Sequence, residues 1–115
     1  MGGFEEAIAE PPQMRLRLLP EAERELEIGA DFYESQRVGL GAYFNDCLAS
    51  DIESLNLYAG IHEQYRGFFR LLSKRFPFAV YYRLTQDWIE IYAVLDCRQD
   101  TRTIDAILDS QRTSR

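Results

Sequence analysis

The first regular pattern in the chain alternates between basic and apolar residues. In residues 14–19 (MRLRLL), two arginines separate the leucines at a spacing of two, as in a strand that is buried on one face only. Pro11 and Pro12 come just before this run, and proline neither continues a helix nor occupies a central strand. We therefore expect a flexible N-terminal tail over residues 1–13 and a first strand from Met14.

The apolar spacing then changes to the three- and four-residue intervals of a helix. Pro20 suits a first helical turn, and glutamates follow it, where the positive end of the helix dipole stabilises acids. Apolar residues keep this spacing up to a turn around Gly39 and resume it from Leu40 to Ala59, before Gly60 as a left-handed cap. The pattern predicts a helical hairpin whose second helix has about five turns.

The rest of the chain is rich in aromatic and β-branched residues, the types that favour strands. Three such segments, separated by short polar runs, cover residues 68–72, 76–84 and 88–95, and they predict an antiparallel meander. A short helix is expected over residues 103–108, with Asp100 or Thr101 as its cap. We expect an α+β fold of order β-α-α-β-β-β, in which the helical hairpin packs on one face of a mostly antiparallel four-stranded sheet.

Strict alternation assigns the side chains of the last two strands to the two faces of that sheet. It places Ala93 and Leu95 on the apolar face that the hairpin covers, and Val94 on the opposite face. The opposite face is mixed in character and is expected to carry Tyr81, Arg83, Glu90 and Tyr92. In this prediction it is the solvated side of the sheet.

Composition fits a single small globular domain. The chain has 115 residues and a mass of 13.4 kDa, with 46% hydrophobic and 28% charged residues, as in ordinary water-soluble folds. We expect one domain over residues 14–110 and a C-terminal tail over 111–115. No apolar run is long enough for a membrane span, and no basic, apolar leader opens the chain. A cytoplasmic protein is therefore expected, with no membrane partner and with Cys47 and Cys97 as reduced thiols.

Charge is distributed unevenly along the chain. Residues 1–59 hold 12 acids and 4 bases, whereas residues 60–115 hold 7 acids and 9 bases, within a net charge of −6. No acid occurs from Gln64 to Gln86, and five bases do, so this block is suited to an anionic partner. The acidic pI of about 4.8 opposes broad, non-specific binding to nucleic acid.

Several familiar kinds of site are absent or weak. A histidine-based catalytic triad needs a histidine as proton carrier, and the only histidine, His62, lies in a link where a solvated residue is expected. Asp96 and Asp100 are close enough in sequence to hold a divalent ion, but such a pair is expected by chance among 19 acids. We expect no cofactor and no metal.

Arginine and tyrosine form the most informative set of residues. Guanidinium and phenol groups on an open sheet are suited to gripping phosphate or stacking on bases, and they also pair across strands on any wet sheet face. Both interpretations remain open. The set consists of Arg70, Arg83 and Arg98 with Tyr81, Tyr92 and Lys74.

Five stretches of the sequence resemble the ParE-like branch of the RelE/ParE toxin superfamily, which includes plasmid stabilisation toxins. They are MRLRLLPEAE (residues 14–23), ADFYE (30–34), GLG (39–41), RFPFAVYYR (75–83) and Ala93 to Leu95 followed by Arg98 and Asp100. The resemblance covers about residues 14–100, and RFPFAVYYR is its most specific part. It implies a helical hairpin packed on an antiparallel sheet, in agreement with the periodicity.

The resemblance implies a toxin that inhibits growth and is neutralised by a co-encoded antitoxin. ParE-like members act on DNA gyrase by protein contact, whereas RelE-like members cut messenger RNA on the ribosome without a metal. RelE-type cleavage uses an arginine in the third strand and often a C-terminal tyrosine, but here that strand position is Ala79 and no tyrosine follows Tyr92. A gyrase-directed, non-enzymatic toxin is therefore expected, with target-binding candidates Arg70, Tyr81, Arg83, Tyr92 and Arg98.

Two alternatives to a gyrase-directed toxin remain. If the protein is a ribosome-dependent endoribonuclease, Arg70, Lys74, Arg83 and Arg98 would bind phosphate and stabilise developing charge. The third possibility is a detoxified relative that binds only its antitoxin, because many ParE-like chains have His-Gly-Arg-Arg-Asp-Pro where this chain has residues 96–101 (DCRQDT). Asp96 and Thr101 are the departures that favour this third possibility.

Overall fold

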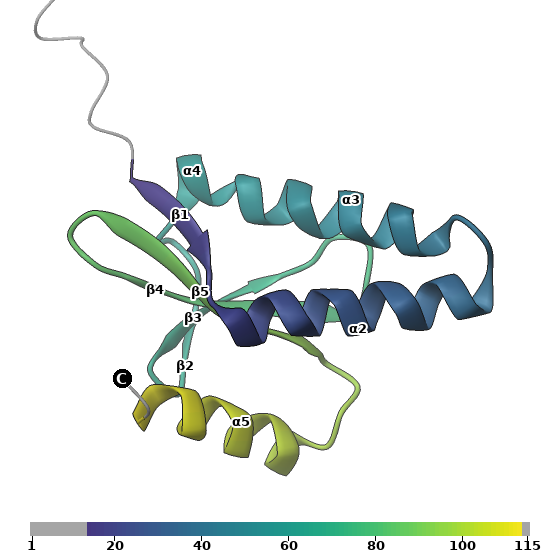
Figure 1. Ribbon diagram of the computed structural model, residues 1–115. Helices are drawn as coiled ribbons and strands as arrows, with labels where there is room; N and C mark the ends of the chain where they lie inside the picture. Colours follow the sequence, from purple (N-terminus) through teal and green to yellow (C-terminus); the bar gives the residue numbers. More distant parts are fainter. Residues whose placement is uncertain (1–13, 114–115) are drawn as a thin grey trace, which may run out of the picture.

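The structure, a computed structural model, describes residues 14–113; the tail predicted over 1–13 and residues 114–115 lie outside the described part. In this α+β arrangement, the described chain forms one strand and three helices, then four consecutive strands and a last helix (Figure 1). In chain order the elements are β1 (Arg15–Leu18), α2 (Pro20–Gln36), α3 (Leu40–Glu53), α4 (Leu55–Tyr58), β2 (Gln64–Tyr65), β3 (Phe68–Leu72), β4 (Phe78–Leu84), β5 (Trp88–Asp96) and α5 (Thr101–Thr113). The predicted class, helical hairpin and C-terminal helix are confirmed.

The sheet has five strands in the order β1-β5-β4-β3-β2, so the prediction of four strands was wrong. The missed strand β2 is two residues long and pairs antiparallel with the start of β3, which is too short to produce a periodic pattern. Arg66 and Gly67 form the turn between them with positive φ angles of 52° and 87°. β1 pairs parallel with β5, and the other pairs are antiparallel.

The second helix of the hairpin is interrupted where one helix of about five turns was predicted. α3 ends at Glu53 and the short α4 follows after Ser54. The Ser54 hydroxyl donates a hydrogen bond to the Asp51 carbonyl at 2.5 Å. A serine that bonds to the backbone of the preceding turn competes with regular helical hydrogen bonds, which is consistent with the break at this position.

The turn of the helical hairpin explains the ADFYE (residues 30–34) and GLG (residues 39–41) motifs. Gly39 has a φ of 91°, in the left-handed region that favours glycine. The Glu34 carboxylate accepts hydrogen bonds from the backbone N–H groups of Gly39 and Gly41 at 3.0 to 3.1 Å. A Cβ atom at Gly41 would lie 2.6 Å from the Ala30 carbonyl oxygen, so only glycine allows α3 to approach α2 this closely.

One face of the sheet packs against the hairpin of α2 and α3, which run side by side in Figure 1. The buried residues of this hairpin face are Ala22, Phe44, Leu48, Ile52, Leu55, Phe78, Val80, Tyr82, Ile89, Ile91 and Val94. Val94 belongs to this face, whereas Ala93 and Leu95 belong to the other, so the predicted alternation was wrong after Ile91. The register between β4 and β5 shifts there: Tyr92 is the extra residue of a β-bulge, which reverses the alternation.

The opposite face of the sheet is covered by α5, which lies apart from the hairpin in Figure 1. This α5 face buries Leu19, Phe68, Ala79, Tyr81, Tyr92, Ala93, Leu95, Ile104 and Leu108. It is therefore not the solvated side that alternation alone suggested. α5 is longer than the predicted helix and includes residues 111–113, and the backbone N–H of Arg102 donates to the Asp100 carboxylate at 2.8 Å as an N-terminal cap.

None of the helices described over residues 14–113 combines the length and the apolar character needed to cross a membrane.

Candidate functional site

The two tyrosines of the predicted set are part of the core. Tyr81 and Tyr92 are 2% and 3% exposed beneath α5. Burial raises the pKa of the Tyr81 hydroxyl, and the Tyr92 hydroxyl donates a hydrogen bond to Glu90 at 3.4 Å. In the folded chain these side chains position their neighbours and offer almost no surface to a target.

Arg70 lies at the middle of β3, directly opposite Tyr81 in β4. Its guanidinium forms an ion pair with Glu63 at 2.9 Å and stacks on the Tyr65 ring at 5.0 Å from the centroid. The pKa of Arg70 is raised because hydrogen bonds to Glu63 and Tyr81 outweigh the effect of partial burial. Arg70 is thus neutralised by one carboxylate and held over an aromatic ring.

Arg83 lies near the far end of β4 and stacks on two rings. Its guanidinium carbon is 4.6 Å from the centroid of Phe68 and 5.4 Å from that of Tyr92. Its Nε donates to the Gly67 carbonyl at 3.2 Å, so the side chain is fixed by cation–π contacts and a backbone carbonyl. Across the strands it faces Glu90, which bonds to Arg17.

Arg98 follows β5 and is the most exposed arginine of the predicted set. Its side chain is 58% exposed and binds the Asp96 carboxylate through two nitrogens, at 2.9 and 2.7 Å. This pairing lowers the pKa of Asp96. The guanidinium also reaches the Tyr33 hydroxyl in α2 at 3.4 Å. The Asp96 carboxylate therefore binds Arg98, and the Asp100 carboxylate binds Arg102 at 3.2 Å. The two carboxylates considered for a divalent ion thus each bind an arginine.

Lys74 and Arg83 lie at opposite ends of the β3–β4 hairpin. Lys74 is in the turn between the strands, where its backbone N–H donates to Asp51 at 3.4 Å. Lys74 lines a hollow beside α3 with Asp46 and Cys47. The structure thus places the predicted basic residues along the sheet, each with a different set of neighbours.

The remaining sequence candidates have local structural contacts. His62 bonds through Nδ1 to the Tyr82 hydroxyl at 2.5 Å, and partial burial lowers its pKa, so it is less solvated than its position in a link suggested. Cys47 and Cys97 are both free thiols. No group of three or more histidine, cysteine, aspartate or glutamate side chains in the part of the chain that the structure describes is placed to hold a metal ion.

Sequence reasoning missed a charged cluster between the β2–β3 turn and α5. Arg66 binds Asp109 at 2.7 Å and lies 3.7 Å from Asp105, and Arg112 binds Asp109 at 3.2 Å. The Tyr65 hydroxyl donates to Asp105 at 2.6 Å. Asp105 and Asp109 are one helical turn apart, and Arg112 is three residues from Asp109, which were usable signals. Their partners Tyr65 and Arg66, however, are 40 and 43 residues away along the chain.

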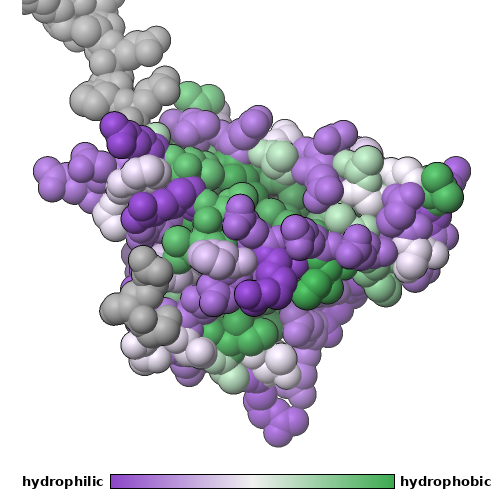
Figure 2. All heavy atoms as spheres, in the orientation of Figure 1, coloured by the Kyte–Doolittle hydropathy of each residue, from purple (hydrophilic) through white to green (hydrophobic). Residues whose placement is uncertain are grey.

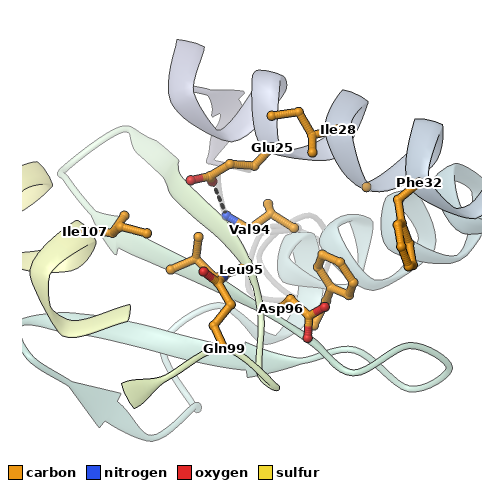
Figure 3. Close-up of a pocket in the computed structure, with 10 residues that line it drawn as sticks. Glu25, Ile28, Phe32, Val94, Leu95, Asp96, Gln99 and Ile107 are labelled. Carbon is orange, nitrogen blue, oxygen red and sulfur yellow. Dashed lines mark hydrogen bonds between the residues drawn. The ribbon is translucent and has the colours of Figure 1, made fainter. Parts of the chain in front are cut away.

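A cleft between α2, the end of β5 and α5 was also missed. It has a volume of about 400 Å³ and is shown in Figure 3, with α2 above the strand. Its lining residues are Glu25, Ile28, Gly29, Phe32, Phe78, Val94, Leu95, Asp96, Gln99 and Ile107. On the same side of the molecule, Figure 2 shows apolar surface near the middle, interrupted and bordered by hydrophilic side chains.

Comparison with known proteins bears on the fold. No family model and no curated protein sequence matches the chain. A chain of a solved structure described as the chromosomal ParDE TA system from P. aeruginosa is similar in structure, with a TM-score of 0.64 and 20% sequence identity, over 73% of this chain and 96% of that chain. This protein therefore has the fold found in a chain of that ParDE system, and the resemblance predicted from its sequence is confirmed at the level of the fold.

Proposed function

We propose that this protein is the toxin of a type II toxin–antitoxin system, of the ParE-like kind, and that a co-encoded antitoxin neutralises it in the cytoplasm. The observation that carries the proposal is the structural match to a chain of a ParDE TA system over 96% of that chain. It agrees with sequence motifs such as ADFYE and GLG, which meet in space where Glu34 caps the turn of the hairpin.

The proposed mode of action is protein contact with DNA gyrase, without an enzymatic step. Acid–base or electrostatic catalysis on one phosphate needs its groups to converge within hydrogen-bond reach of that phosphate. Lys74 and Arg83 lie at opposite ends of one strand hairpin, and Arg70 and Arg98 are each paired with a carboxylate. This arrangement favours the non-enzymatic proposal over a ribosome-dependent endoribonuclease.

Arg98 is the side chain we propose for target contact. It is more than half exposed and is pre-oriented by Asp96 and Tyr33, which lowers the entropy lost when a partner binds it. Of the other predicted target-binding residues, Tyr81 and Tyr92 act indirectly by supporting the sheet, and Arg70 and Arg83 border the face that α5 covers.

Expression in a bacterial host tests the proposal. Induction of the gene alone is expected to arrest growth, and co-expression of the neighbouring reading frame is expected to restore it. Normal growth combined with tight binding of the neighbouring protein would instead identify a detoxified relative. Normal growth without binding would contradict the proposal as a whole.

The target is tested by comparing DNA and messenger RNA after induction. We expect linearised DNA or loss of supercoiling by purified gyrase, with intact transcripts by primer extension. Arg98→Ala is expected to abolish the arrest while Arg102→Ala, an exposed arginine also paired to a neighbouring aspartate, retains it. Transcript cleavage with intact DNA would contradict the gyrase proposal, and full toxicity of Arg98→Ala would contradict the assigned contact.

A further inference from the structure

The outer edge of β5 is paired over only part of its length. β1 pairs with β5 from Trp88 to Ile91, and the backbone N–H of Leu19 then donates to the Ile91 carbonyl at 3.0 Å. From there the chain turns into α2, whereas β5 continues to Asp96. Among the described strands only β4 pairs with this last part of β5. An unpaired strand edge presents backbone groups to which another chain can bind.

Glu25 occupies the place that a neighbouring strand would take. Its carboxylate accepts a hydrogen bond from the backbone N–H of Val94 at 2.7 Å (Figure 3). The two residues are 69 positions apart in the chain, so the contact is not a local cap. A side chain therefore satisfies a backbone donor that a strand carbonyl would bind in a longer sheet.

The walls of the cleft beside this edge suit apolar side chains. Ile28 and Phe32 of α2 are 60% and 50% exposed and line the cleft with Ile107 of α5. Figure 3 shows these side chains on elements that flank the end of β5. The exposed apolar residues of α2 lie on one side of this backbone edge and the partly buried Ile107 lies on the other. Such walls suit strand addition, in which hydrogen bonds hold the peptide and pockets accept its alternate side chains.

The charges at the cleft specify the chemistry of the added strand. Asp96 is neutralised by Arg98, but no ion pair in the described part of the chain includes Glu25. The pKa of Glu25 is raised to about 7, mainly by burial and in part by nearby Glu21, against the lowering effects of the Val94 hydrogen bond and of Arg24. A carboxylate that gives up its backbone donor to an incoming strand then needs a cationic partner.

We propose that an extended segment of the antitoxin adds to the edge of β5, takes the Val94 N–H from Glu25, and pairs a lysine or arginine with the released carboxylate. The inference rests on the proposed function because the occupant is the antitoxin. It concerns how that partner is held, through a backbone edge and a carboxylate of this chain. The segment carries apolar side chains for the Ile28–Phe32 wall and one cationic side chain for Glu25.

Amide hydrogen exchange at Val94 tests the backbone part of the proposal. The probe is the full-length product of the neighbouring reading frame, added to the full chain. In the free protein, Glu25→Ala is expected to speed exchange of the Val94 amide about tenfold, the effect of one hydrogen bond. In the complex, the wild type and Glu25→Ala are expected to show equal protection, because the partner's carbonyl now accepts the bond.

The affinity for the partner protein tests the proposed pairing of the Glu25 carboxylate with a cationic side chain. Glu25→Gln, which keeps an acceptor for Val94, is expected to weaken binding about tenfold through the lost charge pair. Glu27→Gln, on the exposed side of the same helix, is the matched control and is expected to change affinity less than about twofold. Replacement of the partner's basic residue in the protected segment should weaken binding to the wild type and leave binding to Glu25→Gln unchanged.

Failure of the inference is distinguishable from failure of the proposed function. If the neighbouring protein binds but Val94 exchange in Glu25→Ala stays fast, or the bound segment is helical in its chemical shifts, strand addition is excluded and the toxin–antitoxin proposal stands. A second outcome would make the inference wrong: the Val94 amide becomes protected when the concentration of this protein alone is raised, and sedimentation shows a dimer. In that case a second copy of this chain binds the edge of β5. Absence of any binding would contradict both proposals.

Discussion

The two faces of the sheet are buried by different means. On the hairpin face, aromatic rings pack directly: Tyr33, Phe44, Phe76 and Phe78 have centroid separations of 4.8 to 6.3 Å. On the α5 face, buried apolar residues are bordered by polar contacts, such as those of Glu90 with Arg17 and of Tyr65 with Asp105. The first face combines ring packing with a polar contact of Tyr82 to His62, whereas ion pairs border the second face, so the two faces should respond differently to mutation.

Phe44→Ala is expected to give the largest effect. Phe44 is fully buried and contacts three other rings. Its truncation should lower the free energy of unfolding by about 3–5 kcal/mol, measured by chemical denaturation. Phe32→Ala, which removes a half-exposed ring of the same hairpin, is the control. A loss below about 1 kcal/mol would mean that the hairpin face does not depend on close packing.

Leu108→Ala tests the α5 face by the same kind of change. Leu108 is fully buried beneath α5, and large-to-small core changes cost about 2–5 kcal/mol. Because α5 packs on the opposite face of the sheet from the α2–α3 hairpin, we expect faster hydrogen exchange in α5 while amides of α2 and β4 keep their protection. The smaller truncation Ile107→Val, in the cleft wall, is the matched control. Uniform loss of protection over the whole domain would show that the two faces unfold as one unit.

Arg17→Ala tests the polar partners of the α5 face. Glu90 is 5% exposed and binds Arg17 through two nitrogens. Removal of Arg17 leaves this carboxylate with a long hydrogen bond from Tyr92, which should cost about 1–3 kcal/mol. Arg15→Ala, on the same strand and over the same Trp88 ring, controls for the loss of an arginine. Equal effects of the two variants would mean that the Glu90 partner is unimportant.

Glu25→Gln is expected to change stability least at low pH, where both side chains are neutral, and to act mainly on its pH dependence. The pKa of Glu25 is raised from 4.5 to about 7 by burial, so the folded chain holds the proton more tightly than the unfolded chain. Its stabilising contribution is complete below pH 4.5 and is lost as the pH rises through 7. Denaturation of wild type and Glu25→Gln across this range should show a smaller decline in the variant. Parallel curves would contradict the raised pKa.

Much of the fold could be predicted because its signals are local. Periods of two and of three to four residues identify the long elements, and Gly39 with Glu34 fixes the turn of the hairpin through contacts only five residues apart. The pairing of Arg98 with Asp96 is equally local. The strand β2 was not predicted because two residues are too few to show a periodic pattern. The side chain of Val94 was assigned to the wrong face of the sheet because the bulge at Tyr92 arises from the pairing between strands.

The α+β class, the helical hairpin, the limits of most elements and the basic character of the second half follow from the order of residues along the chain. Three features depend on the packing of the whole domain: α5 buries Tyr81 and Tyr92, the predicted basic residues spread along the sheet, and Glu25 reaches the unpaired edge of β5. The physical reason is the range of the interactions. Backbone propensity and side-chain period act over a few residues, whereas burial and pairing of distant groups depend on the register and packing of the whole domain.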